Sequence, residues 1–141
     1  MSAASNYTEQ NLLNAVLLGV AYPLPTGTYV SLHTADPTDA GTPATEVQTA
    51  DWPAYVRRHA EAGGAIGTGW TAPVDGVSTN VNQLTWPSMD GLLDVTITHF
   101  AVWDAPTGGN MLTYAAFITP RTLKTGDIFV VDSNALTVTQ S

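Results

Sequence analysis

The sequence predicts a mainly β protein, with a β-sandwich or jelly-roll-like domain of about seven strands after one N-terminal amphipathic helix. Two observations lead to this prediction. After Pro25, short β-branched and aromatic runs alternate with clusters of Gly, Pro, Asp and Asn. The 141 residues also suit one hydrophobic core, and no linker divides them. We therefore expect a single domain over residues 1–141, with a helix at 6–19 and a β domain at 27–140.

The helix at 6–19 is predicted by apolar residues at helical spacing. Asn6 is the expected N-cap, Glu9 occupies the capping-box position, and Gly19 and Pro23 end the helix. One apolar stripe is made by four residues: Leu12, Leu13, Val16 and Leu17. Most amphipathic helices cover the core of their own domain, so this is the first interpretation. The alternative is that the helix docks against a neighbouring subunit.

The strands follow in chain order and are bounded by turn residues. We expect them at residues 28–34, 54–61, 81–86, 94–103, 111–119, 127–131 and 135–139, the last two forming a hairpin. Within 94–103, alternation predicts one face made by Val95, Ile97, His99, Ala101 and Trp103. Residues 62–79, rich in Gly, Thr and Ala, predict a long surface loop with room for a short strand near Trp70.

Low charge content and an acidic balance restrict the expected partners. Charged residues make up 11% of the chain, and 12 acidic against 4 basic residues give a net charge of −8. An acidic surface repels phosphate groups and anionic lipid, so we expect neither nucleic acid nor a membrane as partner. The first basic residue is Arg57, so residues 1–22 lack the basic region of a secretory signal. The apolar run 12–24 is too short to span a membrane.

The residues that could support catalysis or metal binding do not form a recognisable motif. The three histidines, His33, His59 and His99, lack the spacing of a two-histidine metal arm. Residues 63–69 lack the lysine of a phosphate-binding loop, and most Asp residues lie in predicted turns. The chain has no Cys. We therefore expect no enzymatic activity, no cofactor and no metal.

Several segments follow one another in a characteristic order along nearly the whole chain. They are residues 12–14, 29–37, 46–47, 55–58, 78–80, 84–87, 99–105, 108–112, 126–127 and 135–139. In this order they resemble a family of small tailed-bacteriophage virion proteins, labelled tail fibre, minor tail or capsid decoration (cement) proteins. The most specific segment is Leu-His-Thr-Ala-Asp-Pro at 32–37, whereas Trp86-Pro87 stands where Phe-Pro is usual. The resemblance implies a structural protein of the virion, assembled in the host cytoplasm.

This resemblance leads to three hypotheses about function. The first is a non-enzymatic capsid decoration protein, a homotrimer that binds and stabilises the assembled lattice of the major capsid protein. The second is a minor tail or tail fibre component that binds tail proteins. The third is a host-glycan-binding module on the virion, in which an exposed Trp52 or Trp70 stacks on sugar rings.

The surface expected to contact other subunits is predicted from two long intervals of the sequence that contain no charged residue. Residues 10–35 and 105–120 contain no Asp, Glu, Lys or Arg, so we expect these two intervals to contribute most of the contacts. The expected interface residues are Leu12, Leu13, Val16, Leu17, Tyr29, Trp52 and Trp70.

Overall fold

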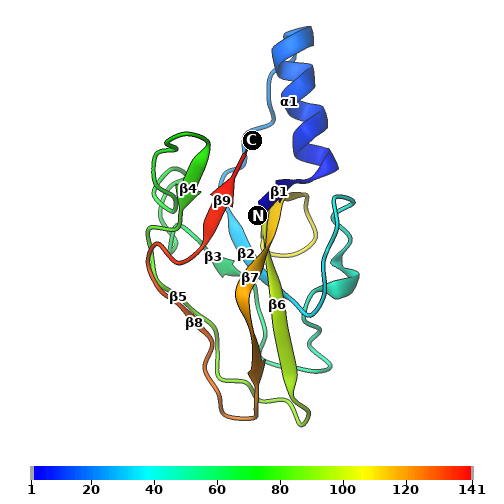
Figure 1. The fold of residues 1–141 in the computed structure, drawn as a ribbon, viewed down its shortest axis with the longest axis vertical. Coiled ribbons are helices and arrows are strands. Elements are labelled where there is room, and N and C mark those ends of the chain that lie inside the picture. The colour runs from blue at the N-terminus through cyan, green and yellow to red at the C-terminus, as the bar shows by residue number, and fades with distance from the viewer. Residues whose placement is uncertain (1, 141) are drawn as a thin grey trace.

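A five-stranded antiparallel sheet forms the main layer of the protein (Figure 1). The computed structural model describes residues 2–140. The strands are, in spatial order, β1 (Ser2–Ala4), β7 (Met111–Leu123), β6 (Val95–Trp103), β2 (Tyr29–His33) and β3 (Arg58–His59). The strongly apolar strands β2 and β6 are adjacent inside the sheet. Both bury residues on both of their faces, as expected of interior strands.

Two short β-ribbons form a second layer against this sheet. β4 (Val77–Thr79) pairs with β9 (Thr137–Thr139), and β5 (Leu84–Thr85) pairs with β8 (Val130–Val131), both antiparallel. A short 3-10 helix, η1 (Pro43–Thr45), lies in the connection between β2 and β3. The predicted mainly β, sandwich-like fold with one N-terminal helix is therefore confirmed.

The hydrophobic core between the layers contains a chain of aromatic contacts. The ring of Trp86 lies 5.5 Å from that of Phe129, Phe129 lies 5.7 Å from Phe117, and Phe117 lies 5.3 Å from Phe100. Trp86 and Phe129 adjoin β5 and β8, whereas Phe117 and Phe100 belong to β7 and β6. These edge-on and tilted contacts therefore join the ribbon layer to the sheet.

The helix α1 (Asn6–Leu18) forms where the sequence predicts it, but its cap differs. The Ser5 side chain accepts a hydrogen bond from the amide of the third helical residue at 3.2 Å, so Ser5 is the N-cap. Asn6 is the first helical residue, and Glu9 lies one position beyond the capping-box site. Gly19 ends the helix in the left-handed region at φ 69°, as predicted.

A wide bulge in β7 changes which residues of β6 share a face. His99 pairs with Ala116 but Ile97 pairs with Arg121, so the four β7 residues 117–120 stand against the single β6 residue Thr98. The predicted single face of β6 is therefore wrong, because the bulge shifts its alternation. The main core contains Val95, Ile97, Phe100 and Val102, whereas Ala101 and Trp103 lie in a second cluster.

The predicted C-terminal hairpin is also wrong, because β8 pairs with β5 and β9 with β4. Asn80 supports this arrangement from the segment between β4 and β5. Its side-chain amide donates to the Asp132 carbonyl at 2.9 Å, and its Oδ1 accepts from the Leu136 amide at 2.8 Å. These bonds hold the turn between β8 and β9 against another part of the chain.

Other strands differ from the prediction in length. The strands predicted at 54–61 and 81–86 shorten to β3 and β5, whereas β7 extends four residues beyond the predicted end at Thr119. β4 lies within the predicted loop 62–79, and Trp70 forms only an isolated bridge with Asn80. The edge strand β1 was not predicted.

Candidate functional site

The helix α1 projects from one end of the molecule and has no buried residue (Figure 1). The expectation that it covers the domain's own core is wrong, because residues of the two β layers and their loops fill both hydrophobic clusters. The apolar stripe is open to solvent. The exposed fractions are 51% for Leu12, 57% for Leu13, 70% for Val16 and 71% for Leu17. Docking against a neighbouring subunit stays a prediction.

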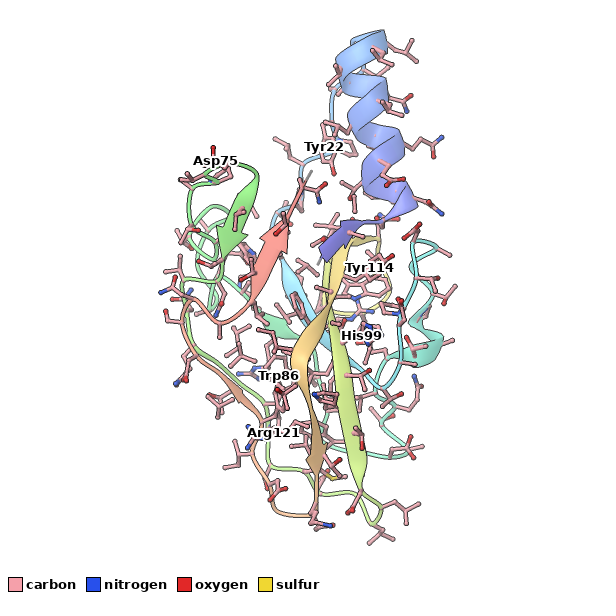
Figure 2. The ribbon with its side chains drawn as sticks, viewed as in Figure 1. Tyr22, Asp75, Trp86, His99, Tyr114 and Arg121 are labelled. Atoms are coloured by element: carbon pink, nitrogen blue, oxygen red, sulfur yellow. The ribbon has the colours of Figure 1, made fainter. Side chains whose placement is uncertain are left out.

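These four residues form the α1 stripe: Leu12, Leu13, Val16 and Leu17. At about 100° per residue, Leu12 and Val16 make one row along the helix and Leu13 and Leu17 make a second. Together the rows cover an arc of about 140°. Half-buried side chains occupy the other part of the circumference: Tyr7, Thr8, Asn11, Asn14 and Ala15. Tyr22 of the following segment lies beside the helix (Figure 2).

Hydrogen bonds hold the base of α1 against the sheet. The Ser5 hydroxyl donates to the Met111 carbonyl, and the Thr8 hydroxyl donates to the Leu112 carbonyl at 2.8 Å. The Asn6 amide donates to the Asp39 carbonyl at 2.9 Å. The helix therefore starts from a fixed point where β1 and β7 pair.

The exposed apolar surface continues past the helix, which the residue-by-residue prediction missed. Leu18, Val20 and Leu24 are 72%, 53% and 81% exposed. The apolar run at 12–24, interrupted at Asn14, is the signal in the sequence for this surface, and it lies within the uncharged interval 10–35 expected to make contacts. We call α1 and residues 19–25 together the arm. No helix within residues 2–140 is long and apolar enough to cross a bilayer.

The three remaining predicted interface residues contribute little exposed surface. Trp52 is 0% exposed and its indole nitrogen donates to the Ser88 carbonyl at 3.3 Å, so a partner cannot reach it in this structure. Tyr29 and Trp70 are half-buried. The Tyr29 ring packs edge-on against His59 at 4.8 Å, and the Trp70 indole donates to Thr28 Oγ1 at 2.9 Å. The aromatic platform required by the glycan hypothesis is not exposed.

Burial explains much of the missing charge outside the arm. In 29–33, four of five residues are buried, and in 111–115 the residues alternate between buried and half-buried. Charge is excluded from such positions by the cost of desolvation. The exposed uncharged parts that remain are the arm, the turn 106–110 and the bulge at 116–120, where Ile118 is fully exposed.

The histidines are used within the fold. His33 is 0% exposed and bonds to Ser31 Oγ through Nε2 at 2.7 Å and to Thr45 Oγ1 through Nδ1 at 2.9 Å. Burial lowers the pKa of His33 to about 4. His99 is its cross-strand partner and contacts the Thr98 hydroxyl at 2.8 Å. Within residues 2–140, no group of three or more His, Asp or Glu could hold a metal ion.

The most elaborate polar cluster connects three loops. Arg57 forms two hydrogen bonds with the Glu46 carboxylate, both at 2.8 Å, and donates to the carbonyls of Ala105 and Gly108 at 3.0 and 2.8 Å. Its guanidinium lies 3.9 Å from the centre of the Trp103 ring. Arg57, Glu46 and Ala105 are half-buried and Gly108 is exposed, and the contacts join three segments, so the cluster is best explained as a structural tie.

A second carboxylate contact shows the same structural use. Glu61 is 3% exposed and accepts from the Thr28 amide at 2.9 Å and from the Thr28 hydroxyl at 2.7 Å. His59 lies 3.5 Å away. Glu61 therefore closes the start of β2 onto the segment after β3.

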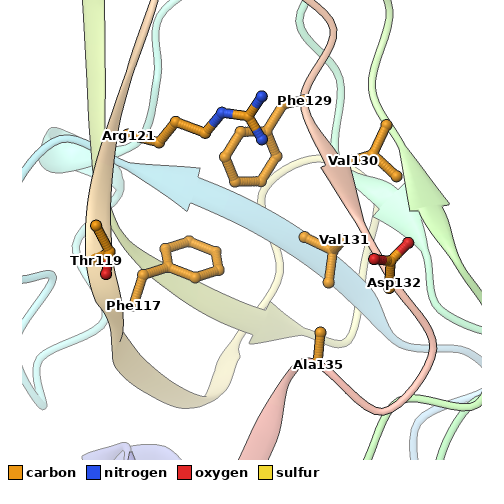
Figure 3. A pocket seen from close by; sticks show the side chains of 8 residues that line it. All are labelled: Phe117, Thr119, Arg121, Phe129, Val130, Val131, Asp132 and Ala135. Atoms are coloured by element: carbon orange, nitrogen blue, oxygen red, sulfur yellow. The ribbon is translucent and has the colours of Figure 1, made fainter.

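The four surface hollows described here are small, and few charged side chains line them. One of about 210 Å³ lies between β7 and β8, with Phe117 and Phe129 inside and Arg121 over the Phe129 ring at 5.7 Å (Figure 3). Three others have volumes of about 260, 290 and 220 Å³. None of the four is lined by more than one carboxylate, whereas hydrolysis of a glycosidic bond uses a pair.

The fold and the exposed arm together define a class of protein: a β body that carries an exposed apolar arm. The family model described as podophage GP4 fiber I protein gp80 matches residues 3–139. The chain belongs to this family of phage fibre proteins, and it is therefore a structural protein of the virion. A search of curated proteins gave no significant match.

Proposed function

We propose that this protein is a non-enzymatic component of the phage tail or its fibres, attached to neighbouring virion proteins through the arm. One observation supports this most strongly: the α1 stripe is more than half exposed, yet the base of the helix is fixed to the sheet. An apolar surface on a rigid support is a typical protein-binding feature.

Burial of the α1 stripe would supply a favourable free energy comparable with the lower end of the cost of association. Full burial of one Leu or Val side chain contributes about 1.5–3 kcal/mol. Covering four such side chains, each half to two-thirds exposed, would contribute on the order of 5 kcal/mol before the costs of association. Repeated copies in the particle would add avidity to this contact.

Capsid decoration is the competing hypothesis. It shares the structural role, and within residues 2–140 the compact body with its helix of 13 residues contains no long coiled-coil stalk. The family description favours a fibre location instead. The two hypotheses differ in copy number, because a decoration protein covers the head lattice whereas a tail or fibre part occupies a few sites.

Mass spectrometry of purified virions, with the major capsid protein as internal standard, tests the proposal. We expect a copy number far below that of the major capsid protein, and cryo-EM density for this chain at the tail. A copy number comparable with the major capsid protein, with density on the head, would instead establish capsid decoration. Absence from purified virions would reject both locations.

A further inference from the structure

We propose that the α1 stripe packs against the α1 stripes of other copies of this chain, so that the arms form a helical bundle. This refines the proposed function, in which the arm is the attachment surface. The occupant of the stripe is therefore a second copy of the same helix.

The protein's own body cannot cover the stripe without breaking existing contacts. Ser5 and Thr8 bond to the carbonyls of Met111 and Leu112, which fixes the direction of the helix at its base. At the other end, Gly19 turns the chain back in the left-handed conformation. Tyr7, on the half-buried face of α1, is close enough to Tyr22 of this returning segment to feel its charge, so the stripe lies on the other side of the helix.

The charge distribution favours another copy over a charged partner. The net charge is −8, and Glu9 supplies −1 of it, so the rest of the chain has −7. Between Glu9 and Asp36 there is no charged residue. Two acidic molecules therefore meet with least repulsion through their arms. A basic or acidic groove on another protein would find no opposite charge along the stripe.

The width and area of the stripe indicate more than one neighbouring helix. A two-helix seam uses a narrow row of side chains, whereas the arc of about 140° has two rows. A large aliphatic side chain offers on the order of 100 Å² of apolar surface, and stable interfaces bury at least about 600 Å² per partner. One row falls short of this area. Both rows, with Val20 and the polar flanks, come closer to it, whereas Leu18 lies on the opposite side of the helix.

Multi-angle light scattering of the purified full-length protein tests the proposal. We expect a mass of three or more copies, which the double variant Leu13→Ser/Leu17→Ser reduces to one copy. The matched control is Leu92→Ser/Leu93→Ser, because these leucines are 96% and 74% exposed and lie outside the arm. The control should retain the wild-type mass. A dimer that the Leu13/Leu17 variant disrupts would overturn the bundle, because each helix would then contact only one neighbour.

A monomeric wild type, or an oligomer that the Leu13/Leu17 variant leaves intact, would overturn the proposal. Near-ultraviolet circular dichroism from the buried Trp residues shows whether each variant keeps its fold. The substituted side chains are exposed, so we expect unchanged spectra.

A second measurement uses the absence of Cys in the natural chain. Nitroxide labels at Leu17→Cys should show spin–spin broadening between copies, because the helix is about 20 Å long and the stripes meet. Dilution with unlabelled protein should remove the broadening. Labels without mutual broadening in a confirmed oligomer would place the contact elsewhere and reject the proposal.

The outcomes also separate this inference from the proposed function. A protein that is monomeric in solution but present at the tail of the virion rejects self-docking and retains the tail role. A protein that forms the helical bundle but is absent from virions retains self-docking and rejects the tail role.

Discussion

Among residues 2–140, buried polar side chains other than that of Trp86 have specific partners, and His33 is the clearest case at the scale of single residues. It accepts and donates within a pocket formed by Ser31 and Thr45, with no exposed surface. Burial lowers its pKa to about 4, with opposing effects from Glu46 and from Arg57 and His99. Within the segment Leu-His-Thr-Ala-Asp-Pro, packing explains Leu32, His33 and Pro37, which are buried, whereas residues 34–36 are exposed.

This pKa leads to a testable dependence of stability on pH. The pKa of His33 is lower in the folded state than its ordinary value of 6.5, so the unfolded chain takes up the proton first. The free energy of unfolding should therefore fall by up to about 1.4 kcal/mol per pH unit as pH decreases from 6.5 to 4. Urea unfolding of the wild type and His33→Gln at several pH values measures this. Equal slopes in both proteins would contradict the assignment to His33.

A comparison of Trp86 with Trp103 measures how much a buried indole hydrogen bond contributes to the free energy of unfolding. The Trp103 indole donates to Ser31 Oγ at 2.8 Å, whereas the buried Trp86 indole nitrogen has no partner. Trp103→Phe removes that bond and weakens the contact with Arg57, so it should cost at least about 1 kcal/mol more than Trp86→Phe. Thermal unfolding of both variants measures the difference. Trp86→Phe as the more destabilising change would be evidence against this explanation.

At the scale of elements, Arg57 matters because it joins segments that belong to no common strand pair. It connects the loop containing Glu46 with the turn after β6 at Ala105 and Gly108. The segments 55–58 and 99–105 meet at this tie, through Arg57, Trp103 and Ala105. Spacing along the chain alone did not reveal that they meet.

The Arg57 tie predicts a large difference between two arginine substitutions. Arg57→Lys keeps the positive charge but cannot reproduce the planar fork, so it should cost about 2 kcal/mol or more. Arg121→Lys is the control, because Arg121 is exposed and its change should stay within about 0.5 kcal/mol. Denaturant unfolding compares them. Similar losses for both would mean that the Glu46 contact contributes no special stability.

The sequence predicts elements well where the pattern is local and less well where distant contacts decide. The helix ends within one residue of the expectation, because Gly19 and the apolar spacing are local signals. The face of β6 and the C-terminal pairing were wrong, because the bulge at 117–120 and the bonds of Asn80 depend on other parts of the chain. No local pattern contains that information.

At the scale of the whole molecule, the low charge content has two causes. Part of it reflects burial in β2 and in the first half of β7. The other part belongs to the exposed arm, where burial explains nothing. Sequence patterning found Leu12, Leu13, Val16 and Leu17, but it could not show whether the chain covers them itself. Whether the chain covers these four residues depends on how completely the β layers fill the core.

The central claim is that the arm holds this protein in the virion, and incorporation of arm variants tests it most directly. Virions are assembled with Leu13→Ser/Leu17→Ser or with the control Leu92→Ser/Leu93→Ser, and mass spectrometry counts the copies retained. We predict at least a tenfold loss for the Leu13/Leu17 variant, which corresponds to about 1.4 kcal/mol, and wild-type incorporation for the control. Wild-type incorporation of a correctly folded Leu13/Leu17 variant would contradict the claim.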